Sequence, residues 1–237
     1  MVAAIVLAAG AGRRMETDVP KQFLTIGGEP VITKTLRVFE NCDLVDAVLL
    51  VTKEEYIDYC RSEIVGKSGL GKVTDVIPGG KERWQSVQNA LAFCGKRYGF
   101  REVSPWTEDG NNVLIHDGAR PFVTEDILSR AVQEVRRCGA AAVGVHAKDT
   151  VKIADEDGFI LKTPDRRSVW QIQTPQAFSY SLICAANRAV METCGMDGVT
   201  DDAMIVEKSG FARVKLVEGA YSNRKLTTPE DLVGLEK

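Results

Sequence analysis

Glycines and basic side chains gather near the start of the chain, where they could bind a run of phosphates. Residues 3–8 form an apolar run that predicts a buried parallel strand, because no polar face alternates through it. Gly10 and Gly12 follow, and glycine permits positive φ and close approach of backbone amides to an anion. Arg14 and Lys21 add positive charge to the same loop. These residues predict a cradle for a triphosphate.

Three other interpretations of a glycine loop after a strand fit this sequence less well. A dinucleotide fingerprint needs a third glycine, and Met15 stands at that position. The nearest match to a P-loop is at residues 66–72, where Val73 replaces the hydroxyl that binds magnesium, so we interpret it as a turn. An ordinary strand-to-helix turn would explain the glycines but not the Pro-Lys-Gln-Phe sequence at residues 20–23.

A second glycine loop follows the predicted strand at residues 73–77. Gly79 and Gly80 precede a helix that starts at about residue 82, and Arg83 and Ser86 lie in its first turn. Free amides at a helix start can bind carbonyl or phosphate oxygens of a ligand. The alternative, a solvated Arg83 and an outward-facing Ser86, is favoured when these residues are taken alone.

An acid and a base emerge together from the predicted strand at residues 113–117. Ligands of open α/β sheets bind at the carboxyl ends of strands, and Asp117 and Arg120 lie there. A carboxylate beside a triphosphate suits Mg²⁺, which prefers oxygen ligands and keeps phosphates and waters as partners. Asp117 is therefore the predicted metal ligand. The alternative is a local ion pair between Asp117 and Arg120.

Apolar strands and amphipathic helices alternate along almost the whole sequence. This alternation predicts an α/β fold, with residues 1–237 forming one doubly wound domain around a mostly parallel sheet. We expect Thr124, Ser179 and Thr200 to begin helices, and a last helix to follow Thr228.

One segment breaks the alternation. Two alternating limbs flank an Asp-Gly turn within residues 149–163, which predicts a β-hairpin arm at about 148–165. An isolated hairpin is marginally stable in water, so this one should pack on another surface. A second subunit is the economical candidate, and packing on its own domain is the alternative.

Composition excludes several functional classes. A net charge of −3 gives no basic surplus for nucleic-acid or membrane-surface binding. The six cysteines form no CxxC pair and predict buried thiols in a reducing compartment, while two histidines are too few for a histidine-rich metal centre. No apolar run is long enough to span a bilayer, and the arginines follow the first apolar run instead of preceding it. We expect a cytoplasmic location, or a stromal one if a transit segment has been removed.

The predicted loops suit one reaction class. Two glycine loops, several basic side chains and one acid fit attack on an α-phosphate with diphosphate leaving. Such a reaction needs neutralised charge and alignment more than a protein base, because a phosphate nucleophile is already ionised. The lack of an obvious catalytic histidine agrees with this chemistry.

Seven short motifs, in order from end to end, make the assignment specific. The sequence resembles the 2-C-methyl-D-erythritol 4-phosphate cytidylyltransferase family, whose fold is a Rossmann-like nucleotidyltransferase. The motifs are Ala8–Met15, Pro20–Phe23, Gly79-Gly80 with Arg83 and Ser86, His116–Pro121, Thr174–Gln176, Thr200–Ala203 and Asn223–Lys225.

The resemblance implies a role for each matching residue. Arg14 and Lys21 match the pair that stabilises the pentavalent transition state, and Arg166 and Lys225 match the residues that position methylerythritol phosphate. The positions that match CTP recognition are Ala8, Ala9, Gly10, Gly12, Gly80, Arg83 and Ser86. The positions that match substrate contacts are Asp117, Arg120, Thr150, Thr174 and Thr200, with Asp117 also near the metal.

The resemblance also implies the partners. The substrates would be CTP and 2-C-methyl-D-erythritol 4-phosphate, with Mg²⁺ as the divalent cation. The products would be 4-diphosphocytidyl-2-C-methyl-D-erythritol and diphosphate, in non-mevalonate isoprenoid synthesis. The arm would cross to the other subunit of a homodimer, so that Thr150 and Arg166 serve the partner's site.

Two other functions remain as alternatives. Ribitol-5-phosphate cytidylyltransferases share the fold and chemistry, but the sequences at residues 8–10 and 165–166 favour the methylerythritol enzyme. A nucleotide-binding regulatory protein without turnover would not need Arg14, Lys21 and Lys225 together.

Overall fold

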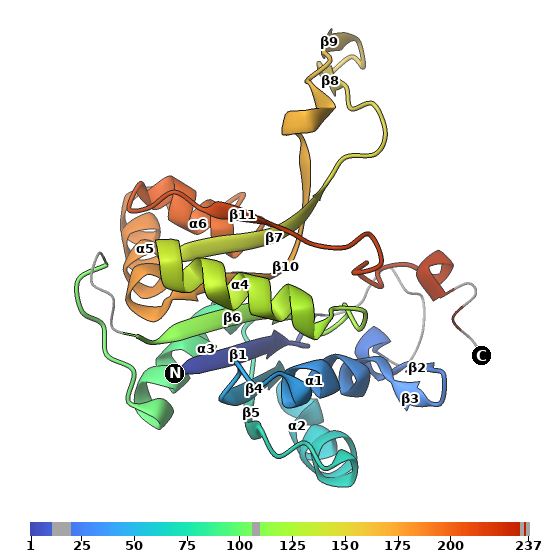
Figure 1. Ribbon diagram of the computed structural model, residues 1–237, viewed down its shortest axis with the longest axis vertical. Helices are drawn as coiled ribbons and strands as arrows, with labels where there is room; N and C mark the ends of the chain where they lie inside the picture. The colour runs from blue at the N-terminus through green and yellow to red at the C-terminus, as the bar shows by residue number, and fades with distance from the viewer. Residues whose placement is uncertain (11–19, 106–109, 233–234, 236–237) are drawn as a thin grey trace.

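The fold is a seven-stranded sheet with helices on both faces and a hairpin that projects from one end (Figure 1). The computed structural model describes residues 1–10, 20–105, 110–232 and 235. The strands are β1 (Val2–Leu7), β2 (Thr25–Ile26), β3 (Glu29–Pro30), β4 (Ala47–Thr52), β5 (Val73–Pro78), β6 (Asn112–Asp117), β7 (Ala140–His146), β8 (Ile153–Ala154), β9 (Ile160–Lys162), β10 (Trp170–Ser179) and β11 (Lys215–Glu218). The helices are α1 (Val31–Asn41), α2 (Ile57–Tyr59), α3 (Arg83–Tyr98), α4 (Glu125–Cys138), α5 (Tyr180–Thr193) and α6 (Asp202–Ser209).

The main sheet has the order β11-β7-β10-β6-β1-β4-β5. Strand β1 pairs in parallel with β4 and β6, β5 is parallel to β4, and β11 is parallel to β7. Only β10 among the strands of this sheet runs antiparallel to its neighbours, β6 and β7. The carboxyl ends of β1, β4, β5 and β6 therefore meet at one edge of the sheet. This arrangement confirms the predicted doubly wound, mostly parallel fold.

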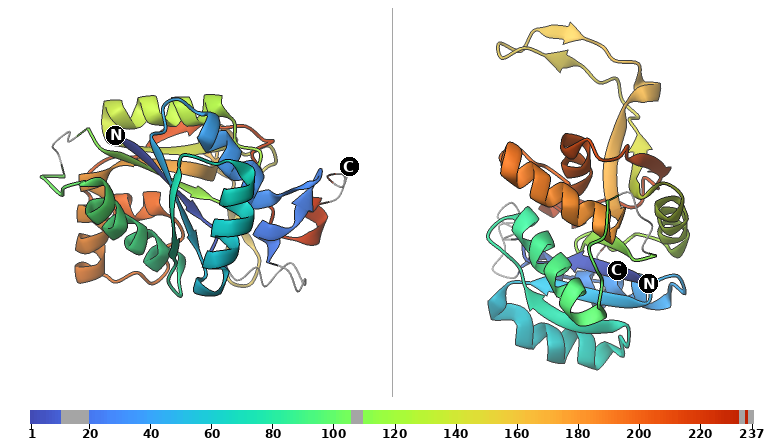
Figure 2. Two further views of the ribbon diagram at one scale, coloured as in Figure 1. Left: turned by 90° about the horizontal axis from the view of Figure 1, so that it is seen from below. Right: turned by 90° about the vertical axis from the view of Figure 1, so that its left-hand side faces the viewer.

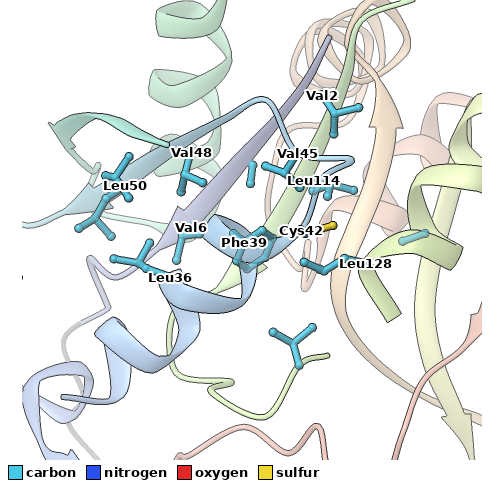
Figure 3. Close-up of a cluster of buried hydrophobic side chains, with 14 of the residues drawn as sticks. Val2, Val6, Leu36, Phe39, Cys42, Val45, Val48, Leu50, Leu114 and Leu128 are labelled. Carbon is cyan, nitrogen blue, oxygen red and sulfur yellow. The ribbon is translucent and has the colours of Figure 1, made fainter. Parts of the chain in front are cut away.

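The central strands are buried on both faces, which explains why their sequences lack a polar alternation. In β1, Val2 and Val6 pack toward α1 and α4, in the cluster drawn in Figure 3. Ala3 and Ile5 point to the opposite face and pack with residues of α3, α5 and α6. Figure 2 shows α4 on one side of the sheet and α3 with α5 on the other. Two apolar layers of this kind hold the strand ends in fixed positions.

The predicted hairpin is present, and it extends away from the sheet instead of folding back on it (Figure 1). Strands β8 and β9 pair in an antiparallel manner around a turn in which the Asp155 amide donates to the Phe159 carbonyl over 3.0 Å. The Asp155 carboxylate also accepts from the Phe159 amide over 2.8 Å. Phe159 is 72% exposed, and Ile153, Ile160 and Leu161 are exposed as well. The arm thus presents an apolar surface that its own domain does not cover.

Of the four predicted helix starts, the structure confirms the Thr124 cap and differs in detail from the other three predictions. Thr124 caps α4 as expected, by accepting from the Ile127 amide over 3.3 Å. Ser179 precedes α5, but its side chain makes no capping hydrogen bond. The cap of α6 is Asp201 and not Thr200, because the Asp201 carboxylate accepts from the Met204 amide over 2.9 Å. Where a last helix is predicted after Thr228, the described residues form a 3₁₀ turn at Pro229–Leu232.

The expectation of buried thiols is partly met. Four cysteines are buried, but Cys138 and Cys194 are exposed, and all six are free thiols. Among the described residues, no helix is both long and apolar enough to cross a bilayer.

Candidate active site

A cavity of about 460 Å³ opens at the sheet edge where β1, β4, β5 and β6 end. Its walls come from the segments that follow these strands, together with residues near the carboxyl end of the chain. The lining residues are Leu7, Ala8, Ala9, Gly10, Lys21, Gln22, Lys53, Gly80, Lys81, Glu82, Arg83, Ser86, Asp117, Ala119, Lys225 and Thr227. The cavity is thus located where ligands of open α/β sheets bind.

The first wall is the start of the glycine loop and the 3₁₀ turn at Lys21–Phe23. The buried Gln22 side chain donates to the Ala8 carbonyl over 2.8 Å, which joins the two ends of the loop. Phe23 packs edge-on against Tyr56, with ring centroids 5.1 Å apart. Lys21 lies between Pro20 and these two anchored side chains and lines the cavity. The anchored residues of the Pro-Lys-Gln-Phe motif therefore position Lys21 at the cavity.

The second wall is the Gly79-Gly80 loop, which lies against the first. A Cβ at Gly79 would come within 2.6 Å of the Ala9 Cβ and 2.7 Å of the Ser86 Oγ, so only glycine fits there. The Gly80 amide donates to Ser86 Oγ over 3.0 Å, and Ser86 Oγ donates to the Glu82 carbonyl over 3.3 Å. Ser86 therefore shapes the loop as well as lining the cavity.

Asp117 lies at the centre of the basic residues of the cavity. Lys225 Nζ is 2.8 Å from Asp117 Oδ2, and Arg120 Nε is 3.8 Å from the same oxygen. Arg83 Nε is 3.8 Å from Asp117 Oδ1. Burial opposes ionisation, but the charges of Lys225 and Arg83 outweigh it and hold the pKa of Asp117 below its ordinary value. Asp117 is thus a carboxylate at neutral pH, as a metal ligand must be.

Arg83 joins the cavity to α6. Its Nη2 donates to Asp202 Oδ2 over 2.6 Å, and the Asp202 side chain is fully buried. Burial opposes the charge of Arg83, but Asp202 outweighs it and raises the pKa of Arg83. The start of α6 is fixed in turn by Gln176, whose Oε1 accepts from the amides of Asp202 and Ala203 over 3.0 and 2.9 Å. The Thr174–Gln176 and Thr200–Ala203 motifs are therefore one structural unit behind Arg83.

A neutral histidine supports Asp117 from below. His116 Nε2 lies 3.2 Å from the Arg120 carbonyl and must carry the proton to donate to it. Nδ1 then accepts from Thr174 Oγ1 over 3.0 Å, and Thr174 Oγ1 accepts from the Asp117 amide over 3.1 Å. Burial lowers the pKa of His116 to about 4. His116 is thus a structural, uncharged residue and not an acid or base of the reaction.

The structure brings most of the predicted site residues together. Those that line the cavity are Ala8, Ala9, Gly10, Lys21, Gly80, Arg83, Ser86, Asp117 and Lys225. Arg120 and Thr174 lie directly beneath, in contact with Asp117. Thr150, Arg166 and Thr200 are exposed and do not line this cavity. Gly12 and Arg14 lie outside the described residues.

The sequence interpretation missed several lining residues. Lys53 follows directly after β4, so it carries the same positional signal as Asp117 after β6 and could have been found. Lys81, directly after the second glycine loop, also lines the cavity. Ala119 lies within the His116–Pro121 motif, but an alanine, like Thr227 in its loop, indicates no role by its type.

The residues present fit a magnesium ion that binds mainly to phosphate oxygens of a bound nucleotide. No group of three or more potential metal-ligating side chains occurs in the described parts of the chain. Asp117 supplies one ionised carboxylate on the cavity wall. Mg²⁺ commonly binds through one or two carboxylates plus phosphates and waters, so a single acid is sufficient.

Comparison with known proteins assigns the family. The family model of 2-C-methyl-D-erythritol 4-phosphate cytidylyltransferase (IspD) matches residues 2–236. The enzyme of that name from Geobacter metallireducens is 46% identical over 232 residues, covering 98% of this chain and 94% of the relative. The one from Lachnospira eligens is 44% identical, covering 98% and 96%.

Solved structures agree with the sequence relatives. The crystal structure of 4-diphosphocytidyl-2C-methyl-D-erythritol synthase from Anaerococcus prevotii is 32% identical with a TM-score of 0.81, covering 99% of this chain and 94% of that chain. The cytidylyltransferase from Thermus thermophilus is 28% identical with a TM-score of 0.70, covering 98% and 96%. The family model and these relatives cover almost the whole chain, and residues of the matching motifs line its cavity. The chain therefore belongs to the 2-C-methyl-D-erythritol 4-phosphate cytidylyltransferase family.

Proposed function

We propose that this chain transfers the cytidylyl group of CTP to 2-C-methyl-D-erythritol 4-phosphate. A phosphate oxygen of the methylerythritol substrate attacks the α-phosphorus of CTP, and the bond from that phosphorus to the β-phosphate oxygen breaks. The products are 4-diphosphocytidyl-2-C-methyl-D-erythritol and diphosphate, in non-mevalonate isoprenoid synthesis. The main support for this proposal is the cavity at the carboxyl edge of the sheet, which Lys21, Arg83 and Lys225 line together. The chain also matches the model of this family over residues 2–236.

The basic residues supply the catalysis in this proposal. Lys21 and Arg14 stabilise the charge that develops on the pentavalent α-phosphate, because fixed positive groups act most strongly where charge increases. Lys225 and Arg166 orient the methylerythritol phosphate. No protein base is needed, since the attacking phosphate is ionised before reaction.

The glycine loops supply nucleotide binding. Gly79 lies so close to Ala9 that a Cβ at position 79 would come within 2.6 Å of the Ala9 Cβ, so the starts of both loops lie side by side at the cavity. The residues assigned to CTP are Ala8, Ala9, Gly10, Gly12, Gly80, Arg83 and Ser86. The residues assigned to the second substrate are Asp117, Arg120, Thr150, Thr174 and Thr200.

Asp117 would hold Mg²⁺ together with phosphate oxygens of CTP. When bound, the ion neutralises phosphate charge and so favours departure of diphosphate. Within the chain itself, Asp117 keeps Lys225 at the cavity wall through their 2.8 Å ion pair.

The arm at about 148–165 is assigned to dimerisation of the single nucleotidyltransferase domain formed by residues 1–237. Its exposed apolar residues, Phe159 above all, need a covering surface, and a second copy of the chain supplies one. Thr150 and Arg166, which do not line the cavity of their own chain, would then act in the partner's site. We place this homodimer in the cytoplasm and propose no nucleic-acid or membrane partner for it.

A substrate comparison tests the proposed function. Diphosphate release is measured with CTP and Mg²⁺, in parallel with methylerythritol phosphate and ribitol 5-phosphate, and with ATP, GTP and UTP in place of CTP. We expect release with CTP and methylerythritol phosphate alone. Release only with ribitol 5-phosphate would move the chain to the alternative pathway, and no release with either would contradict an enzymatic role.

A further inference from the structure

The segment of residues 219–225, which we call the strap, connects β11 to Lys225 (Figure 1). It bends closely around the buried Gln173 side chain of β10. Gln173 Nε2 donates to the Ala220 carbonyl over 2.8 Å. A Cβ at Gly219 would overlap Gln173 Oε1 and come within 2.8 Å of the Val143 Cγ1. The strap therefore lies against the sheet at van der Waals distance.

Asn223 is the most firmly held residue of the strap. Its side chain is fully buried, and Nδ2 donates to Gln173 Oε1 over 3.2 Å and to the Thr174 carbonyl over 3.0 Å. The Asn223 amide donates to the Ala220 carbonyl over 2.9 Å, and its carbonyl accepts from Arg120 Nη1 over 2.9 Å. These bonds fix both the side chain and the backbone of one residue.

Lys225 follows two residues later and lies between two anchors. On its other side, the buried Leu226 donates its amide to the Ala119 carbonyl over 2.8 Å. The Lys225 ammonium reaches Asp117 at the cavity, while Asn223 itself does not line the cavity. A lysine stem is flexible, so the position of its ammonium depends on how well its backbone is fixed.

We propose that Asn223 is a positioning residue for the transfer reaction. Its side chain binds the strap to Gln173 and Thr174 of β10 and so sets the place of Lys225. The inference rests on the proposed function and extends it to a residue outside the cavity. A displacement of about 1 Å in a catalytic group can lower a rate about 10²-fold, so loosening this anchor should be visible in turnover.

A double-mutant cycle tests this role. The variants are Asn223→Ala, Lys225→Met and their combination, with Ser222→Ala as the control, because Ser222 is the exposed neighbour. We expect Asn223→Ala to lower kcat about 10- to 100-fold while KM for CTP changes less than about threefold. In the Lys225→Met background, Asn223→Ala should lower kcat by less than about threefold, because the group it positions is gone. Ser222→Ala should behave as the wild type.

A second measurement does not depend on turnover. Hydrogen exchange of the amides in residues 222–227 should be about tenfold faster in Asn223→Ala, whereas exchange in α4 should stay unchanged. Thermal unfolding of each variant sets an assay temperature at which all are folded.

The outcomes distinguish a failure of the positioning role of Asn223 from a failure of the proposed transfer reaction. An equal loss of kcat from Asn223→Ala in both backgrounds, or unchanged exchange in residues 222–227, would overturn the positioning role. Wild-type turnover on Lys225→Met would overturn it as well, because the positioned group would then be dispensable. A wild type without turnover would refute the proposed function, and the exchange experiment would still decide whether Asn223 holds the strap.

Discussion

Removal of Arg83 should leave a buried carboxylate without its counter-ion. Arg83 makes a 2.6 Å bond to Asp202, whose side chain is 0% exposed. That bond is made by Asp202 Oδ2, while the buried Oδ1 has no hydrogen-bond partner among the described residues. In Arg83→Met the cation is lost and the carboxylate stays behind. Breaking a buried pair by removing one partner typically destabilises by about 3–5 kcal/mol, and this is the loss expected at pH 8.

The loss should depend on pH. Burial raises the pKa of Asp202 even beside Arg83, and without Arg83 that pKa should rise further. The folded variant then binds a proton that the unfolded chain lacks, so its stability increases as the pH falls. The slope is at most about 1.4 kcal/mol per pH unit. We expect the loss to be smaller at pH 6 than at pH 8, by about 1 kcal/mol or more and at most about 2.8 kcal/mol.

Urea unfolding followed by circular dichroism at pH 6, 7 and 8 measures this effect. The matched control is the double variant Arg83→Met with Asp202→Asn, in which position 202 carries no charge. It should recover most of the stability and show little pH dependence of the loss. A loss below about 1 kcal/mol in Arg83→Met, equal at all three pH values, would refute a charged, buried Asp202.

Three further predictions concern catalysis, assembly and acid stability. Lys21→Ala should stay folded while cytidylyl transfer falls about 10²-fold or more, and near-normal turnover would remove Lys21 from the catalytic set. Deletion of residues 151–161 should give a monomer by light scattering, whereas an unchanged dimer would contradict the assignment of the arm. Burial lowers the pKa of His116 from 6.5 to about 4, so between these pH values the unfolded chain takes up the proton and the folded chain does not. The free energy of unfolding should therefore fall by about 3 kcal/mol as the pH falls from about 6.5 to 4. Urea unfolding of His116→Asn should show a weaker pH dependence over this window, and an equal dependence would contradict that account.

The sequence was sufficient for the features that are local. The first glycine loop follows β1, a central strand that is buried on both faces and reads as a continuous apolar run. The second follows β5, an edge strand that is still marked as a strand by its apolar residues Val73, Val76 and Ile77. Because parallel strands end at one edge, the positions of Gly10, Gly80 and Asp117 directly after such strands predict that they meet at the cavity, as they do. The hairpin at β8 and β9 was predictable for a similar reason, since an Asp-Gly turn between alternating limbs is a strong local signal.

Features that depend on distant contacts were not predictable. Arg83 and Asp202 are 119 positions apart, and nothing in either segment indicates that they pair. The same holds for Asn223 and Gln173, which are 50 positions apart. Strand β10 has no clear sequence signal either, since it contains Pro175, and an interior proline normally argues against a central strand.

The helix caps show the same limit on a smaller scale. Thr200 and Asp201 are both good capping residues by type, and only the backbone path decides which side chain reaches the Met204 amide. Ser179 is of the right type and in the right position, yet its hydroxyl makes no bond to the helix. Residue type therefore limits the candidates for a cap, and the three-dimensional path selects among them.

The most direct test of the proposed function is the ³¹P NMR spectrum of the wild-type protein with CTP, Mg²⁺ and 2-C-methyl-D-erythritol 4-phosphate. We expect the signals of CTP and of the monophosphate to decline together, while signals of free diphosphate and of a new diphosphate diester appear in equal amounts. The Lys225→Met variant, checked for folding, should form this diester much more slowly. A spectrum in which both substrates remain unchanged with the folded wild-type protein would contradict the central claim that this cavity catalyses cytidylyl transfer.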